Sequence, residues 1–143
     1  MSFDLRIRDG DLALNSKSAL AIVEDSDKLV QDILKIISTQ LGSNPFFPWY
    51  GSPITKSLVG RPFDTKFVAN IAGQQIRTSL ETLQKMQREQ LKFDQHITPL
   101  EQIAAIQGVT VERNITDARY YRIILTVLSK AFQRVPATLD IRL

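Results

Sequence analysis

The chain has 143 residues, no cysteine and a formal net charge of +3. This length fits one domain that buries enough apolar surface to fold without a metal or a disulfide. The absence of cysteine excludes disulfides, zinc–thiolate sites and thiol nucleophiles. We therefore expect a single domain spanning residues 1–143 that folds in a reducing cytoplasm.

Residues 3–23 carry the signals of short β-strands. Phe3, Leu5 and Ile7 alternate with polar residues, which is the two-residue period of a half-buried strand. Asp9-Gly10 is a typical hairpin turn, because glycine adopts positive φ at little cost. Residues 19–23 form another short apolar run. We predict an N-terminal β-hairpin or arm.

Two main helices are predicted next. In the first, apolar residues recur at helical spacing from Leu29 to Leu41. The acidic segment 24–27 would cap its beginning, and Gly42 would end it. The second is long, begins at Asp64 or Thr65, and has apolar residues at helical spacing up to Met86. Its polar end is expected to be exposed or to contact another subunit.

The remainder is predicted to end in a β-meander. Thr98-Pro99-Leu100-Glu101 has the pattern of a capping box, so a short helix is expected from Pro99 to about Gln107. Residues 109–113 alternate, and residues 120–128 are apolar on both faces, as in a central strand. The predicted fold is α+β: an N-terminal β-hairpin or arm, two main helices plus a short capped helix, and a C-terminal antiparallel β-meander.

No group of residues predicts catalysis. His96 is the sole histidine, and although Asp94 could orient it as a base, its place before a helix cap favours a turn residue. Glu24, Asp25 and Asp27 form an acidic cluster, but their position favours helix capping over glycoside hydrolysis. The sequence contains no Gly-x-Ser-x-Gly elbow and no glycine-rich phosphate loop. We predict a non-enzyme without cofactor or metal.

The charge pattern and hydropathy exclude two kinds of partner. Lysine and arginine are scattered along the chain, whereas nucleic-acid binding typically needs a basic stripe. No apolar run approaches the roughly 20 residues that span a bilayer. The N-terminus also lacks the basic and apolar regions of a signal peptide. We expect binding to neither nucleic acid nor membrane.

The loop of residues 42–53 is rich in aromatic residues. Phe46, Phe47, Trp49 and Tyr50 lie among prolines and glycines that prevent regular structure. Such a loop is too apolar for a flexible linker, so it should pack on the core or on a partner. A small-molecule site is disfavoured because no convergent polar residues accompany the aromatic ones.

The terminal strand, Ala137–Leu143, alternates cleanly. Its apolar side chains face one side, and they are Ala137, Leu139, Ile141 and Leu143. A strand of this kind at a chain end suits strand addition by a partner, since backbone groups give affinity and alternate side chains give register. Alternatively, it pairs with residues 120–128 and completes the domain's own sheet without an open edge.

Taken together, these segments resemble a known family. The relevant features are the N-terminal hairpin, the helix from Leu29 to Thr39, Gly42 with Pro45 and Pro48, Tyr50-Gly51-Ser52, Pro99-Leu100-Glu101-Gln102-Ile103, and the terminal strands. The chain is similar to the baseplate wedge protein of contractile phage tails that initiates the tail sheath. That family includes baseplate assembly protein W and a subunit of the type VI secretion baseplate.

The resemblance implies a structural role in the virion. It implies a protein of the tail baseplate, assembled in the host cytoplasm, that joins the wedge to the tail sheath. Several copies would surround a sixfold baseplate and offer β-strands to the first sheath ring. The implied contacts are sheath pairing at Ala137, Leu139, Ile141 and Leu143, and wedge or inner-baseplate contact at Phe46, Phe47, Trp49 and Tyr50. Tail tube or hub proteins are further implied partners.

Two alternatives follow from the same resemblance. One is the type VI secretion subunit, which the sequence does not distinguish from the phage protein. The other is a lysozyme-like peptidoglycan hydrolase, since some family members are described in that way. Its catalytic acid would be Glu24 or Asp25.

Overall fold

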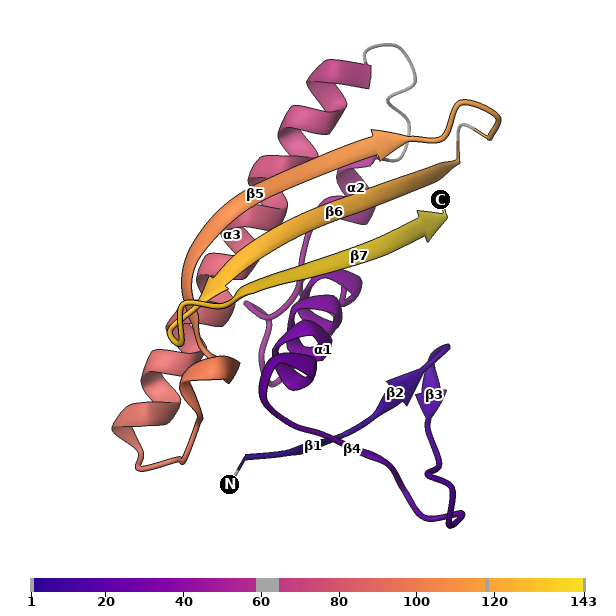
Figure 1. The fold of residues 1–143 in the computed structure, drawn as a ribbon. Helices are drawn as coiled ribbons and strands as arrows, with labels where there is room; N and C mark the ends of the chain where they lie inside the picture. Colours follow the sequence, from indigo (N-terminus) through magenta and orange to yellow (C-terminus); the bar gives the residue numbers. More distant parts are fainter. Residues whose placement is uncertain (1, 59–64, 118, 143) are drawn as a thin grey trace.

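The structure, a computed structural model, describes residues 2–58, 65–117 and 119–142, except for the side chains of residues 65 and 67, and confirms the α+β fold (Figure 1). Small strands come first, helices follow, and a three-stranded antiparallel sheet ends the chain. The elements are β1 (Asp4–Leu5), β2 (Ile7–Arg8), β3 (Asp11–Leu12), β4 (Ile22–Val23), α1 (Asp25–Ser38), α2 (Ile54–Leu58), α3 (Thr65–Lys92), the 3-10 turn η1 (Pro99–Glu101), β5 (Ile103–Arg113), β6 (Tyr120–Ser129) and β7 (Arg134–Arg142).

The C-terminal sheet has the order β5-β6-β7, with β6 in the centre as the sequence predicts. The register of β6 against β7 runs without interruption from Tyr120↔Arg142 to Leu128↔Arg134. Two cross-strand contacts on the outer face of the sheet support this register. Arg122 forms an ion pair with Asp140 (2.9 Å), and the Arg142 guanidinium lies 5.4 Å from the centre of the Tyr120 ring. Such pairs hold a strand against slippage by one residue.

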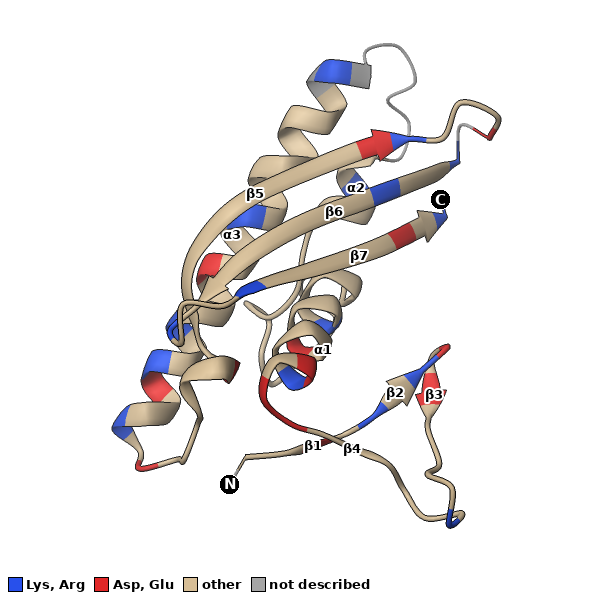
Figure 2. Cartoon of the chain, viewed as in Figure 1, with Lys and Arg blue, Asp and Glu red and all other residues tan. Residues whose placement is uncertain are grey.

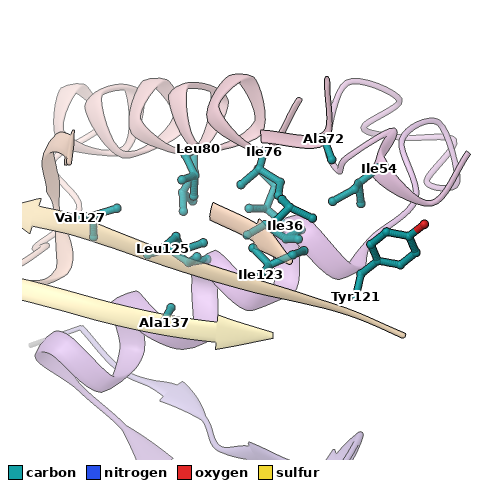
Figure 3. Packing of buried hydrophobic residues seen from close by; sticks show 14 of the residues in the cluster. Ile36, Ile54, Ala72, Ile76, Leu80, Tyr121, Ile123, Leu125, Val127 and Ala137 are labelled. Carbon is teal, nitrogen blue, oxygen red and sulfur yellow. The ribbon is translucent and has the colours of Figure 1, made fainter. Parts of the chain in front are cut away.

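The core lies between the inner face of this sheet and the helices α1 and α3 (Figure 3). Alternate residues of β6 point into it, and Ile123 and Val127 are completely buried. Ile36 of α1 and Ile76 and Leu80 of α3 meet them. Burying each such side chain contributes about 1.5–3 kcal/mol, so this layer supplies the apolar stabilisation of the fold.

The predicted end of the first helix is wrong. The helix α1 stops at Ser38, and Thr39 is extended, with its N–H and hydroxyl both donating to the Lys35 carbonyl. Leu41, predicted on the buried face, lies outside the helix and is 40% exposed. Gly42 does adopt positive φ (82°), but in the following turn rather than as the helix cap. The chain leaves the helix early because Gln40 bridges to Ser52 in the next loop.

The predicted helix from Pro99 to Gln107 is also wrong beyond its first turn. Only η1 is helical, and β5 begins at Ile103. The reason is tertiary: the Gln87 side chain of α3 donates to the Glu101 carbonyl and accepts from the Ile103 N–H, both at 2.8 Å. These bonds hold the segment extended and override its local helix propensity. They also bury Gln87, so the polar end of α3 is partly an internal contact.

The two predicted helix caps do not form. The Thr98 hydroxyl donates instead to the Asp25 carboxylate (2.9 Å), which links η1 to the start of α1. The Glu101 side chain is 1% exposed, and neither carboxylate oxygen has a hydrogen-bond donor in the described part of the chain. Glu24, at the N-cap of α1, makes no capping bond with its side chain. Of the two predicted starting residues of the second helix, Thr65 begins α3, and Asp64 lies outside the described residues.

The N-terminal arm is fastened to α1 by polar contacts. Gln31 accepts from the Ile7 N–H (2.9 Å) and donates to the Leu5 carbonyl (2.8 Å). Asp4 forms an ion pair with Lys35. The root of the arm is therefore held in one orientation against the helix.

Acid is expected to release this root from α1. Burial opposes ionisation of Asp4, but the hydrogen bond and charge of Lys35, helped by the Leu5 amide and Gln31, outweigh it and lower the pKa of Asp4. A lowered folded-state pKa means that the contact is complete above the unfolded pKa of about 3.9 and is lost as the pH falls through the folded value. Amide-exchange protection of Ile7 should therefore fall only as the pH drops below the unfolded value of about 3.9.

Asp4→Asn is the matched control for this acid effect. In this variant, protection of Ile7 should already be reduced at neutral pH and should not change further through the same acid range. A fall of protection in the variant that follows the wild-type pH profile would show that another group controls the contact.

Candidate functional site

The strand β7 is an edge of the C-terminal sheet. It pairs with β6, which confirms that the terminal strand completes the chain's own sheet. On its other side, no strand of the described residues pairs with it (Figure 1). The terminal strand therefore belongs to the chain's own sheet, as the alternative predicts, but the expected absence of an open edge is wrong: within the described residues, one side of β7 has no strand partner.

The register decides which residues of β7 turn their backbone outward. The Ser129 N–H donates to the Gln133 carbonyl (2.9 Å), so these two residues form a hydrogen-bonded pair. In an antiparallel ladder, hydrogen-bonded pairs alternate with non-bonded ones. Counting along the uninterrupted register, the residues of β7 that bond to β6 are Val135, Ala137, Leu139 and Ile141.

The intervening residues direct their N–H and C=O groups away from β6. Pro136 is one of them and has no N–H, which is why a sheet tolerates it at this position. Beyond it, Thr138, Asp140 and Arg142 each carry an outward donor and acceptor. A row of such groups is a template for pairing with another strand.

This geometry revises which residues would make the predicted sheath contact. Ala137 is buried, and Leu139 and Ile141 are half-buried against the core. Their backbone groups face β6, so these residues hold β7 in place rather than offer it to a partner. Leu143 lies outside the described residues. One feature of the sequence predicts which residues of β7 face outward. Pro136 must be one of them, because proline cannot occupy a position whose N–H bonds to β6.

The aromatic loop between α1 and α2 is divided between core and surface. Tyr50 is half-buried and packs against the core, whereas Phe46, Phe47 and Trp49 are exposed by 84%, 52% and 49%. The rings of Phe47 and Trp49 meet edge to face, with their centres 5.8 Å apart. Exposed aromatic residues in contact with one another are typical of protein interfaces.

The base of this loop is fixed by backbone contacts. The Ser52 N–H donates to the Thr39 carbonyl (2.8 Å), and the Ser79 hydroxyl of α3 donates to the Gly51 carbonyl (3.1 Å). Gly51 has a φ of 123°, and a Cβ there would lie 2.6 Å from the Thr39 carbonyl oxygen. Only glycine fits at this point, where the loop crosses close to the end of α1. The crossing holds Trp49 at a defined place on α3.

Trp49 separates two hollows along α3. One has a volume of about 510 Å³, and its other lining residues are Thr82, Lys85, Met86, Glu89 and Gln90. The other has about 490 Å³, and its other lining residues are Leu41, Gly51, Pro53, Gln74, Gln75, Thr78, Ser79 and Thr82. Side chains of a partner protein could enter on either side of the indole.

The residues considered for catalysis are not brought together. Asp25 contacts Thr98 at the start of α1, whereas His96 is exposed in the segment after α3. Across residues 2–58, 65–117 and 119–142, no three His, Asp or Glu side chains are grouped to hold a metal ion. Among the described helices, none combines the length and the apolar character needed to cross a bilayer. Basic and acidic residues are interspersed over the helices and strands (Figure 2).

Comparison with known proteins finds similarity in structure only. No protein-family model matches the chain. No curated protein matches it either. Among solved structures, it resembles a candidate tail lysozyme from Geobacter sulfurreducens, with a TM-score of 0.57 and 12% sequence identity over 93% of this chain and 96% of the other. At this identity the likeness establishes a shared fold across nearly both whole chains.

Proposed function

We propose that the chain is a structural component of a contractile phage tail, a single baseplate-wedge domain over residues 1–143 that initiates sheath assembly. The observation that carries this proposal is the edge of β7, with outward backbone groups at Thr138, Asp140 and Arg142. The fold shared with a candidate tail lysozyme supports the tail context.

Sheath initiation would work by strand addition. A strand of the first sheath subunit pairs along β7 and extends the sheet beyond its edge. Each backbone hydrogen bond contributes about 0.5–1.5 kcal/mol net, so one strand binds weakly. Several copies around a sixfold baseplate would engage a ring of sheath subunits together, and this multivalency makes the start of the sheath stable.

The aromatic loop supplies the second contact of the proposed role. Phe46, Phe47 and Trp49 would pack against another wedge protein, and half-buried Tyr50 would hold the loop to the core. The edge of β7 then stays available for the sheath, while tail tube or hub proteins lie on the inner side. Assembly takes place in the host cytoplasm, and the protein stays in the virion baseplate. A type VI secretion baseplate subunit would use the same two contacts, and the genes that flank this one distinguish the two.

Amide exchange in the presence of the sheath protein tests the pairing residue by residue. Val135, Ala137, Leu139 and Ile141 are bonded to β6 and should be protected in the free protein. Thr138, Asp140 and Arg142 should exchange fast when free and become protected on addition of sheath subunits. If sheath binds while these three amides continue to exchange fast, strand addition at β7 is refuted.

A second candidate is peptidoglycan hydrolysis, which the description of the structural neighbour favours. The catalytic acid would be Glu24 or Asp25, but the Asp25 carboxylate is engaged by the Thr98 hydroxyl. We expect no clearing in zymography on peptidoglycan. Clearing by the wild type that disappears in Glu24→Gln would support the enzyme instead.

A further inference from the structure

The N-terminal arm is built around a three-way junction of strands. The Arg6 N–H donates to the Ala21 carbonyl (2.8 Å), the Ala21 N–H to the Ala13 carbonyl (2.9 Å), and the Ala13 N–H to the Arg6 carbonyl (2.9 Å). Three short ribbons leave this closed triangle: β1 with β4, β2 with β3, and the segment 14–20 that turns back on itself (Figure 1).

All three ribbons place aliphatic side chains on the same face. The cross-strand pairs are Leu5↔Ile22, Ile7↔Leu12 and Leu14↔Leu20. Directly paired residues share a face, and so do residues two apart along a strand. These two rules connect all six side chains around the triangle.

This aliphatic face is turned away from the rest of the molecule. Ile7, Leu12, Leu14, Leu20 and Ile22 are 45–62% exposed. The opposite face carries Ala13 and Val23, which are buried, and Asp4 and Arg6, which form ion pairs with Lys35 and Asp27 of α1. The arm therefore directs its polar face to its own domain and its apolar face to solvent, the reverse of an ordinary half-buried sheet.

We propose that this aliphatic face is the interface of a homodimer, in which the arms of two copies pack face to face. Exposed apolar patches on monomers are ordinarily about 300–600 Å², so two such faces would bury about 1,000 Å² in total, the lower limit for a specific interface. We therefore expect association at micromolar concentrations. The inference does not depend on the proposed function, since it concerns the free chain.

The charges at the ends of the ribbons favour a second copy as the occupant. The β2–β3 turn carries Asp9, and the turn of residues 15–18 carries Lys17, whereas Arg8 and Asp11 lie opposite each other on the other face of the arm. In a dimer whose two-fold axis runs along the β1–β4 ribbon, the β2–β3 ribbon of one copy lies over the 14–20 ribbon of the other. Each acidic turn would then lie over the Lys17 turn of the other copy, so the face is complementary to itself in charge as well as in apolar character.

Sedimentation equilibrium between about 1 and 100 µM tests the dimer, a range set by micromolar affinity. Leu14 is 62% exposed, so Leu14→Lys should leave the monomer folded. Because the substitution occurs twice in the dimer, and each site should cost at least tenfold, we expect association to weaken by about 100-fold or more. The matched control is Ile115→Lys, which changes a fully exposed residue (101%) in the β5–β6 turn and should leave the dimer intact.

Two results would overturn the proposal: a wild-type protein that is monomeric throughout this range, or a Leu14→Lys variant that dimerises like the wild type. The placement of the turns has its own test. Lys17→Glu should weaken the dimer, and Lys17→Glu combined with Asp9→Lys should restore it. A dimer that is indifferent to both variants would contradict the two-fold arrangement along β1–β4.

Discussion

Replacing Gly51 with alanine is expected to destabilise the protein by about 3 kcal/mol, which combines an unfavourable backbone conformation with overpacking. A methyl group at this position would lie 2.6 Å from the Thr39 carbonyl oxygen, and φ is 123°. The neighbouring atoms are backbone at the end of α1, so they cannot move aside as a flexible side chain would. Urea unfolding followed by circular dichroism measures the change.

Gly73 provides the matched control for Gly51. It lies within α3, and a Cβ there would meet nothing within 4 Å. Gly73→Ala should therefore stabilise the protein by about 0.5–1 kcal/mol, because alanine favours the helix. Equal effects of the two substitutions would show that the tight crossing at Gly51 does not form.

Proline substitutions in β7 are expected to have opposite consequences at adjacent positions. Ala137 belongs to a hydrogen-bonded pair with Leu125, so Ala137→Pro removes a ladder bond inside the sheet. It should cost about 2–4 kcal/mol, since the Leu125 carbonyl is left without a donor. No strand in the described part of the chain pairs with the outward N–H of Thr138, so Thr138→Pro should cost only about 1 kcal/mol.

Thermal unfolding of the two proline variants measures this difference. Pro136 shows that β7 accepts proline at an outward position. The backbone groups of Thr138, two residues further on, also face outward. If Thr138→Pro unfolds the protein as severely as Ala137→Pro, the assignment of inward and outward backbone groups along β7 is reversed.

The sequence predicts the central layers of this fold well. Residues 120–128 are apolar on both faces, and β6 is indeed the central strand. The alternation from Ala137 onward correctly separates buried from exposed side chains in β7. The first success rests on the β-branched and aromatic composition of the segment, and the second on periodicity, which reports the burial of side chains directly.

The wrong predictions share a physical cause: contacts with residues far away in the sequence decide which of two possible local structures forms. Residues 103–107 are apolar enough for helix or strand, and the Gln84 and Gln87 side chains of α3 bind their backbone as a strand. The alternation in residues 3–7 predicts a half-buried strand, but only the contacts of Asp4 and Gln31 with the rest of the chain reveal that its apolar side faces outward.

The candidate site was only partly predictable for the same reason. Side-chain alternation in β7 does not tell which backbone groups face β6, because that depends on the register with its partner strand. The aromatic residues of the loop look alike in sequence, yet Tyr50 packs on the core and Phe46 is exposed. Their separation follows from the crossing of Gly51 over the end of α1.

The central claim is that sheath assembly begins on the outward backbone groups of β7. Truncation of Ala137–Leu143 would also remove core residues, so a folded edge variant is the sharper reagent. The double variant Thr138→Pro with Asp140→Pro removes two outward donors and keeps every inward one. Sheath polymerisation seeded by wild-type protein and by this folded variant is the decisive measurement: we predict that the variant fails to seed, and seeding at the wild-type rate would contradict the account.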